Sequence, residues 1–543
     1  MRRPIASVLG AVILCVVLGK AASAHESTRT QIGPLTVTTS ADTGVGSLRW
    51  AITRANAVIG PDSIQFAIGP DDPGHNVSGG TWMISPLEAL PRITDGGLTI
   101  DGLSQARAVG GDPNPFGPEI EINGKNLSGE DALTVQADGV QIRGVTINRC
   151  GRTGICFVSA KGGQVFGCYL GTTTTGEEAA GNAYGIQIIG GSRDIVIGEL
   201  IDPTYGNLIS GNATGVFVQE WSVNISIIGN RIGTNRTGTD TLGNTIHGIC
   251  IQDACDNTKI LHNLVGGNRY GIYMSGPTHS HVASNVVGTN DSWSVNLANS
   301  YCGIYLTGGT HDNLFLANTV GNSSHAGIMN FGANCIRNRL SQNLVSRNLQ
   351  KGIENSWGGN GELPAPVIFS VAATAISGRA GPGNIVEVFA DDSLQGMFFL
   401  GSVPADSTGA FTFPLGDAIT RRYVTATATD TAGNTSEFSL AYLVTSVWEK
   451  TGEVVPTAYS LSQNYPNPFN PSTTIKYELP KSSHVSLTVF DILGREVSVL
   501  VNERRDAGVH EVRFEAAGLA SGVYFYRLQA GPFVDTKKLL LVR

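Results

Sequence analysis

Short apolar runs recur along the middle of the chain with a nearly constant outline. A Gly-Ile or Gly-Val pair followed by alternating positions begins at residues 154, 185, 215, 248, 271, 303, 327 and 352, so each unit takes 23 to 33 residues. Alternation of this kind is typical of a strand with one buried face. Runs this short cannot bury themselves singly, but stacked as successive coils they form one continuous core. The pattern therefore predicts a solenoid of short parallel strands.

A second apolar run in each unit carries asparagine in a fixed column. Its members are Asn230, Asn263, Asn285, Asn318 and Asn343. Asparagine tolerates left-handed backbone geometry, and its amide bonds to backbone groups at bends. We expect a structural column that joins equivalent turns, rather than a catalytic one.

A polar stretch of twelve residues explains the longer units. It reads GTTTTGEEAAGN at 171–182, GTNRTGTDTLGN at 233–244 and, more weakly, GTNDSWSVNLAN at 288–299. Each copy lies in a long unit, so we interpret it as an excursion from one coil. The insertion ELIDPTYGN at 199–207 lengthens another unit.

An amphipathic helix is predicted ahead of the coils, in GSLRWAITRANA at 46–57. Ser47 is a suitable N-cap, and the apolar side chains Leu48, Ala51, Ile52 and Ala55 share one face. Such a helix is suited to cover an open end of the solenoid.

These coils resemble the right-handed parallel β-helix superfamily over roughly residues 34–362, and "GSLR.AI..AN" is similar to the start of bacterial surface members. The superfamily includes pectate lyases, polysaccharide hydrolases, epimerases and surface proteins without known activity, so the resemblance implies fold rather than function. Signatures of polygalacturonases and pectate lyases are missing from the sequence. That argues against those two families and leaves other catalysis open.

Two further domains are expected after the coils, which makes the fold class all-β. Period-two alternation in IVEVFA, FTFPL and YVTATATD predicts an immunoglobulin-like β-sandwich at 363–445, with spacing as its usual role. A linker at 446–458 follows. The segment 459–543, with YPNPFNP near its start, resembles the small β-sandwich sorting domain of type IX secretion. This resemblance implies the type IX secretion machinery as a partner, and removal of the domain on export.

The first 24 residues predict a signal peptide. Arg2 and Arg3 precede an apolar run over 8–18 and the small residues at 22–24. No later stretch is long and apolar enough to predict a transmembrane span in the mature chain. We expect a secreted protein, extracellular or on the outer-membrane surface of a Gram-negative bacterium.

Charge and cysteine content restrict the partners and the redox state. Net charge is −8 without a basic cluster along the body, which argues against nucleic acid as a partner. Seven cysteines remain once Cys15 leaves with the signal, and an odd number excludes a fully paired disulfide framework. Buried thiols are expected.

The residue between the two inward positions of each repeat should face solvent. That column contains Cys156, Gln187, Phe217, Cys250, Tyr273, Tyr305, Met329 and Glu354. Its aromatic members, Phe217, Tyr273 and Tyr305, form either a carbohydrate-binding platform or a structural ladder.

Other residues suggest metal or acid–base chemistry only weakly. Six positions further along the coils stand Asp256, His279, His311 and Cys335, and solvated loop histidines are the favoured interpretation. We expect no metal and no cofactor. The acidic residues available to a polysaccharide-active enzyme include Glu220, Asp253, Asp256, Asp291 and Asp312, with no catalytic assignment. The favoured hypothesis is a surface β-helix that binds extracellular polysaccharide or matrix. The alternative is a lyase, glycoside hydrolase or epimerase that uses a side face.

Overall fold

The computed structural model describes residues 33–58, 60–199, 206–416, 419–444, 458–464, 466–505, 508–516, 518–531 and 533–542. The predicted signal peptide and nearly all of the predicted linker lie outside the described residues. The chain forms two compact units, residues 1–300 and 301–543.

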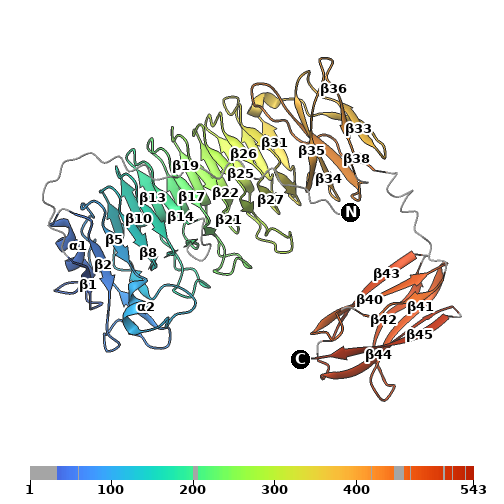
Figure 1. Ribbon diagram of the computed structural model, residues 1–543, viewed down its shortest axis with the longest axis horizontal. Helices are drawn as coiled ribbons and strands as arrows, with labels where there is room; N and C mark the ends of the chain where they lie inside the picture. Colours follow the sequence, from blue (N-terminus) through green and yellow to red (C-terminus); the bar gives the residue numbers. More distant parts are fainter. Residues whose placement is uncertain are drawn as a thin grey trace, which may run out of the picture. The chain divides into compact units, whose positions relative to one another are not determined.

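The first unit is a parallel β-helix with three sheets, because each coil from Thr99 onward contributes one short strand to each sheet (Figure 1). Sheet A contains β1 (Leu35–Val37), β2 (Ser63–Phe66), β5 (Thr99–Asp101), β8 (Gln141–Arg143), β11 (Gln164–Phe166), β14 (Val196–Gly198), β17 (Ser226–Ile228), β20 (Lys259–Leu261) and β23 (His281–Ala283). Sheet B contains β3 (His75–Asn76), β4 (Thr81–Ile84), β6 (Ile120–Asn123), β9 (Val145–Asn148), β12 (Tyr169–Leu170), β15 (Leu208–Ile209), β18 (Arg231–Ile232), β21 (Leu264–Val265) and β24 (Val286–Val287). Sheet C contains β7 (Leu133–Val135), β10 (Thr153–Val158), β13 (Tyr184–Ile189), β16 (Thr214–Val218), β19 (His247–Gln252) and β22 (Tyr270–Ser275).

The repeat identified in the sequence sets the register of sheet C. Val216 pairs with Ile249, which pairs with Ile272, and all three are fully buried. Equivalent apolar residues thus stack on one another along the solenoid and form its core.

The predicted helix is confirmed as α1 (Leu48–Asn56). The Ser47 side chain accepts a hydrogen bond from the Trp50 backbone N–H, and the four predicted apolar side chains are buried. The helix contacts β1 and β2, the first strands of sheet A. A second helix, α2 (Ser104–Val109), ends at Gly110, whose φ of +79° suits glycine.

The asparagine column is confirmed as a hydrogen-bonded ladder. Within the first unit the Asn230 amide donates to Oδ1 of Asn263 at 3.0 Å, and the Asn263 amide donates to Oδ1 of Asn285 at 3.0 Å. A second buried ladder, which the repeat pattern did not predict, is formed by Asn182, Asn212, Asn244, Asn268 and Asn299. Three of its five members are the last residues of the twelve-residue stretches, so those stretches return the chain to the core.

The twelve-residue stretches are excursions, as predicted. Each closes through an antiparallel bridge: Thr172 with Ala179, Thr234 with Thr241, and Thr289 with Asn296. They also cover part of sheet B, because a Cβ added at Gly238 would meet Cδ2 of Leu264 at 2.6 Å.

The second unit begins with coils of the same three-strand pattern. Its parallel strands are β25 (Cys302–Thr307), β28 (Ile328–Phe331) and β31 (Ile353–Ser356), then β26 (Leu314–Leu316) with β29 (Arg339–Ser341), and β27 (Thr319–Gly321) with β30 (Leu344–Ser346). A short 3₁₀ turn, η2 (Gly359–Glu362), follows the last coil.

Antiparallel sheets complete the second unit. Three strands, β32 (Val367–Val371), β33 (Ala375–Arg379) and β36 (Ala410–Pro414), form one sheet of the middle region; β34 (Ile385–Asp391), β35 (Phe398–Pro404), β37 (Tyr423–Thr429) and β38 (Tyr442–Leu443) form the other. The C-terminal region has β39 (Ser460–Leu461), β40 (Ser472–Leu479) and β43 (Gly508–Glu515) in one sheet, and β41 (Ser483–Phe490), β42 (Glu496–Arg505), β44 (Gly522–Ala530) and β45 (Phe533–Leu541) in the other. Each region has its own buried apolar cluster.

The middle region is docked onto the last coils, so it does more than act as a spacer. The Asn348 amide donates to Oε1 of Gln395 at 3.1 Å, which repeats the ladder geometry with glutamine as the last member. Ser341 donates to the buried Glu387 at 2.5 Å, and Val345 forms an antiparallel bridge with Gly396. Burial raises the pKa of Glu387. This region therefore closes the last coils.

No helix in the described part of the chain is both long and apolar enough to cross a membrane.

Candidate functional site

An aromatic cluster lies on the outer face of sheet C in the first unit. Phe217 and Tyr273 occupy the predicted outward column, two strands apart, with Cys250 in register between them. A second column, missed by the sequence analysis, adds Tyr184, His247 and Tyr270. We name these five rings, Tyr184, Phe217, His247, Tyr270 and Tyr273, the first aromatic cluster. All five are half-buried.

The rings of the first aromatic cluster contact one another across the strands. Tyr184 stacks on Phe217 at a centroid distance of 5.3 Å. His247 lies 4.7 Å from Tyr273 and 5.5 Å from Tyr270. A signal for the second column was present in the sequence, because each of its members directly precedes the glycine of the repeat.

His247 is an uncharged member of this cluster at neutral pH. Burial, with a contribution from Arg269, lowers its pKa to about 4. Thr214 Oγ1 lies 3.3 Å from its Nδ1. Burial also raises the pKa of Tyr273, so its hydroxyl stays protonated. The cluster therefore presents hydroxyl and imidazole groups beside apolar rings.

Arginine side chains lie at two places on this face. The Arg269 guanidinium lies 5.4 Å from the centroid of Tyr270. Arg152 forms an ion pair with Asp131 at 3.2 Å, so its charge is compensated.

The expectation that the whole outward column faces solvent is wrong for four members. Cys156, Gln187, Cys250 and Met329 are 0%, 4%, 1% and 6% exposed. For Cys250 the reason is its place between Phe217 and Tyr273, whose larger side chains flank it. Among the described residues all seven cysteines are free and buried, as predicted, and burial raises the pKa of Cys156 to about 12. These thiols are unreactive.

The second unit has its own cluster on β25, β28 and β31 and beside them. Tyr305, the third predicted aromatic, lies 6.3 Å from Tyr301 and 6.3 Å from Phe331, measured between ring centroids. Tyr301 stacks on His325 at 4.8 Å, and His325 Nδ1 lies 3.5 Å from Oε2 of Glu354. We name Tyr301, Tyr305, His325 and Glu354 the second cluster.

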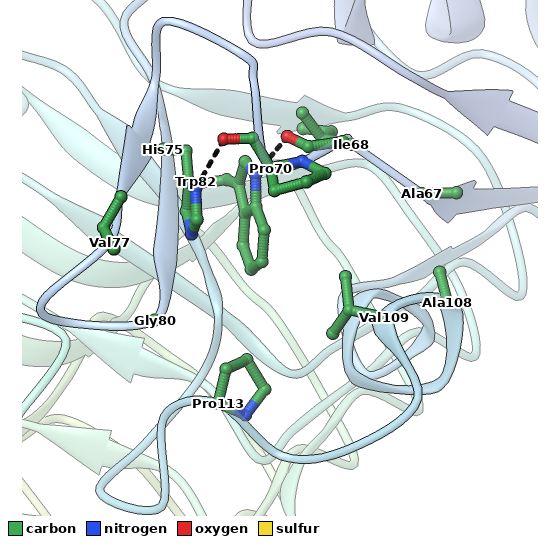
Figure 2. A pocket seen from close by; sticks show the side chains of 11 residues that line it. Ala67, Ile68, Pro70, His75, Val77, Gly80, Trp82, Ala108, Val109 and Pro113 are labelled. Carbon is green, nitrogen blue, oxygen red and sulfur yellow. Dashed lines mark hydrogen bonds between the residues drawn. The ribbon is translucent and has the colours of Figure 1, made fainter.

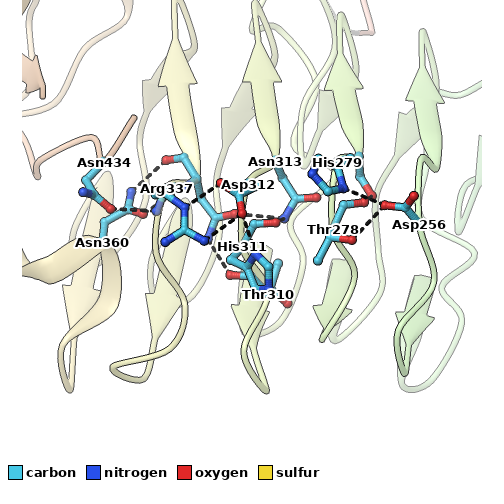
Figure 3. A network of polar contacts seen from close by, with 12 residues as sticks. Asp256, Thr278, His279, Thr310, His311, Asp312, Asn313, Arg337, Asn360 and Asn434 are labelled. Atoms are coloured by element: carbon cyan, nitrogen blue, oxygen red, sulfur yellow. Dashed lines mark hydrogen bonds and ion pairs between the residues drawn. The ribbon is translucent and has the colours of Figure 1, made fainter. Parts of the chain in front are cut away.

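The candidate metal ligands are not gathered by the fold. In the first unit Asp256 accepts hydrogen bonds from Thr278 and His279, both at 2.8 Å. Figure 3 shows His279 directed at this carboxylate. The described residues contain no group of three or more His, Cys, Asp or Glu side chains that fits a metal ion.

In the second unit the same turn carries a compensated carboxylate. Arg337 holds Asp312 through two hydrogen bonds of 2.6 and 2.8 Å, and His311 Nδ1 lies 2.7 Å from the same carboxylate (Figure 3). The Arg337 hydrogen bond is the main reason that the pKa of Asp312 is strongly lowered. Cys335 is buried and donates to the Phe331 carbonyl.

The remaining candidate acids lie at turns. Glu220 accepts from the Gly190 N–H, and its own N–H donates to Asp253, both at 3.0 Å. Asp291 is exposed in the third twelve-residue stretch. The contacts of Glu220 and Asp253 stabilise turns, and they do not bring two carboxylates together as a general acid and base.

A separate pocket of about 550 Å³ opens in the first unit, beside β3, β4 and α2 (Figure 2). His75 stacks on Trp82 at a centroid distance of 4.3 Å, and the indole N–H donates to the Gly69 carbonyl. Its remaining walls are mainly aliphatic and proline side chains. No sequence motif predicts this pocket, because its residues come from four separate segments.

Two family models match parts of the chain. The family described as "Secretion system C-terminal sorting domain" matches residues 463–542. The family described as "Periplasmic copper-binding protein (NosD)" matches residues 116–292. Copper sites use thiolate, thioether or imidazole ligands. In residues 116–292, where described, the cysteines are buried thiols and no His, Cys, Asp or Glu group fits a metal, so the residues do not fit a copper site.

Solved structures match parts of the chain at low identity and low TM-score. The periplasmic alginate epimerase AlgG is 17% identical over 52% of this chain and 66% of its own, with a TM-score of 0.32, so the chain spans slightly less than two thirds of that protein. The Dettilon tailspike protein is 14% identical over 91% of both chains, with a TM-score of 0.27. The Azotobacter vinelandii mannuronan C-5 epimerase AlgE4 A-module is 12% identical over 59% of this chain and 80% of its own, with a TM-score of 0.30. No curated protein matches the sequence.

The sorting domain identifies the route and destination of the protein. Residues 463–542 match the sorting-domain family, and the described part of this region is the pair of antiparallel sheets expected from the sequence. The protein is therefore secreted, to the medium or the outer-membrane surface of a Gram-negative bacterium. The chain is a parallel β-helix repeat protein that carries a type IX secretion C-terminal sorting domain.

Proposed function

We propose that the outer face of sheet C in the first unit binds an extracellular polysaccharide. The observation that carries this proposal is the first aromatic cluster, five half-buried rings on neighbouring strands of one face. Strands in a sheet lie about 4.8 Å apart, so one extended saccharide chain can contact rings on several strands. Aromatic rings with polar tips suit sugars, which combine apolar faces with hydroxyl groups.

A purely structural role for the rings is the competing interpretation. Cross-strand aromatic pairs stabilise a sheet by about 0.5–1.5 kcal/mol beyond area burial. The same magnitude per ring gives a sugar only modest affinity, so we expect weak binding that depends on several rings together. A structural ladder predicts a loss of stability on substitution, whereas a platform predicts a loss of binding.

The test is a double substitution, Tyr270→Ser with Tyr273→Ser, in the secreted protein. We expect retention on a gel of the bound polysaccharide to be lost, while the circular dichroism spectrum and the melting temperature change little. The matched control is Tyr169→Ser, which removes a half-buried tyrosine from sheet B that donates to the Phe116 carbonyl. Wild-type protein that binds no polysaccharide of a broad panel, with a double variant that melts early, would support the ladder instead.

The same panel separates binding from turnover. Unsaturated products, detected by ultraviolet absorbance, or new reducing ends would indicate a lyase or a hydrolase. We expect neither, because four of the five candidate acids, Glu220, Asp253, Asp256 and Asp312, are engaged in turn contacts.

A further inference from the structure

The second cluster differs in chemical character from the first aromatic cluster, because it includes a carboxylate. Glu354 takes the outward position in register with Met329, which pairs in turn with Tyr305. The Glu354 side chain is 18% exposed and that of His325 is 21% exposed. A carboxylate thus lies at the surface, in the same column as an aromatic ring.

The Glu354 carboxylate retains hydrogen-bonding capacity. Its separation from His325 Nδ1, 3.5 Å, is longer than an ordinary charge-assisted hydrogen bond of about 2.7–2.9 Å. His325 Nδ1 itself makes no hydrogen bond within the described residues. A carboxylate has about four acceptor positions, so Glu354 is able to accept from an incoming hydroxyl.

The cation nearest in sequence does not offset this negative charge. Lys351 contacts both oxygens of Glu437, at 2.8 and 2.7 Å. The whole chain carries a net charge of −8. An acidic polysaccharide would therefore bring its carboxylates towards like charge, whereas an uncharged one would not.

We propose that the second cluster is a subsite for an uncharged sugar residue, in which Glu354 accepts hydrogen bonds from sugar hydroxyls beside the rings of Tyr301 and Tyr305. This inference rests on the proposed function, since it names the class of polysaccharide. The carboxylate selects hydroxyl donors because charge-assisted hydrogen bonds are about twice as strong as neutral ones. It also disfavours uronate residues.

The experiment compares wild type with Glu354→Gln in the full secreted protein. The probes are neutral polysaccharides (glucan, mannan, galactan and xylan) and polygalacturonate as the acidic one, at low and high salt. We expect wild type to bind at least one neutral polymer more tightly than polygalacturonate, with little effect of salt on that neutral polymer. Glu354→Gln should weaken neutral binding roughly fivefold, since a neutral amide replaces a charged acceptor.

Matched variants keep the result interpretable. Glu362→Gln removes an exposed carboxylate that accepts from the Gly358 N–H, away from the second cluster's residues, and should leave binding unchanged. Tyr301→Ser tests the stacking surface independently of charge, and melting curves establish that each variant is folded.

The outcomes separate this inference from the function on which it rests. Binding of neutral polymer that Glu354→Gln leaves unaltered, or a wild-type preference for polygalacturonate, overturns the inference and leaves polysaccharide binding standing. A wild-type protein that binds neither class refutes polysaccharide binding itself.

Discussion

Replacing Asn263 with alanine should destabilise the first unit far more than removing an exposed asparagine. The Asn263 side chain is 1% exposed. Its Oδ1 accepts from the backbone N–H and the amide of Asn230, both at 3.0 Å. Its own amide donates to the Ile227 carbonyl at 2.8 Å and to Oδ1 of Asn285 at 3.0 Å. One truncation therefore breaks four buried hydrogen bonds.

The magnitude follows from the partners left behind. The Asn230 backbone N–H and the Ile227 carbonyl lose this partner, whereas Oδ1 of Asn285 keeps the Asn263 backbone N–H at 3.0 Å. A buried group left unsatisfied costs about 1–3 kcal/mol. One such group, the Asn230 backbone N–H, predicts a loss of about 2 kcal/mol in the free energy of unfolding. The loss should extend to both neighbouring coils, because the bonds reach each of them.

Hydrogen exchange is the appropriate assay, since a chain of several regions does not unfold in two states. We expect faster exchange of the amides around Asn230 and Asn285 in Asn263→Ala, together with a lower melting temperature. The control is Asn257→Gly, which removes an exposed amide that donates to Oδ1 of Asn224 at 2.8 Å. Glycine tolerates the φ of +52° at this position, so the change adds no backbone strain. Equal changes in both variants, or faster exchange at residue 263 alone, would show that the hydrogen bonds of the ladder do not stabilise the neighbouring coils.

Three further predictions follow from burial, charge and the sorting domain. Ile260→Asp places an unpaired charge in the core of sheet A and should lower the melting temperature sharply, whereas deletion of part of 236–242 should be mild; equal losses would contradict the coil assignment. His247 has a pKa of about 4 in the folded protein, against a value near 6.5 in the unfolded chain. The folded state is therefore destabilised as the pH falls from 6.5 towards 4, because the unfolded chain binds the proton first. Denaturation of His247→Asn across that range should show a shallower pH dependence, by about 1 kcal/mol after solvent screening, and an unchanged slope would count against the buried neutral ring. Intact mass of secreted protein should show a chain that begins near His25 and ends near Pro456, and retention of residues 459–543 would disprove processing.

Local rules predicted a large part of the fold because each acts within a few residues. The Ser47 cap and the apolar face of α1 follow from 3.6-residue periodicity, and the Asn263 column follows from the repeat itself. The sorting domain was identified from a short proline-rich motif and continues as the expected strands.

Features that depend on side-chain packing were harder to predict. Alternation alone placed Cys250 at the surface, whereas its larger neighbours Phe217 and Tyr273 enclose it. The second aromatic column consists of the first residues of β13, β19 and β22, three positions before the outward residue, so a period of two does not predict the same face for both columns. The docking of Gln395 on Asn348 joins residues 47 positions apart, and no periodicity links them.

The docked sandwich also covers a strand edge on which another copy of the chain could otherwise pair. The last coil of a parallel solenoid presents unpaired backbone donors and acceptors, which are a template for strand addition by another chain. Here Gly396 of the sandwich pairs with Val345 of the last coil, and each backbone N–H donates to the other residue's carbonyl, at 2.7 and 2.9 Å. Antiparallel pairing at this point interrupts the parallel repeat, so a further coil has no matching register to join. The sandwich thereby ends the parallel repeat and blocks strand addition at this edge of the last coil.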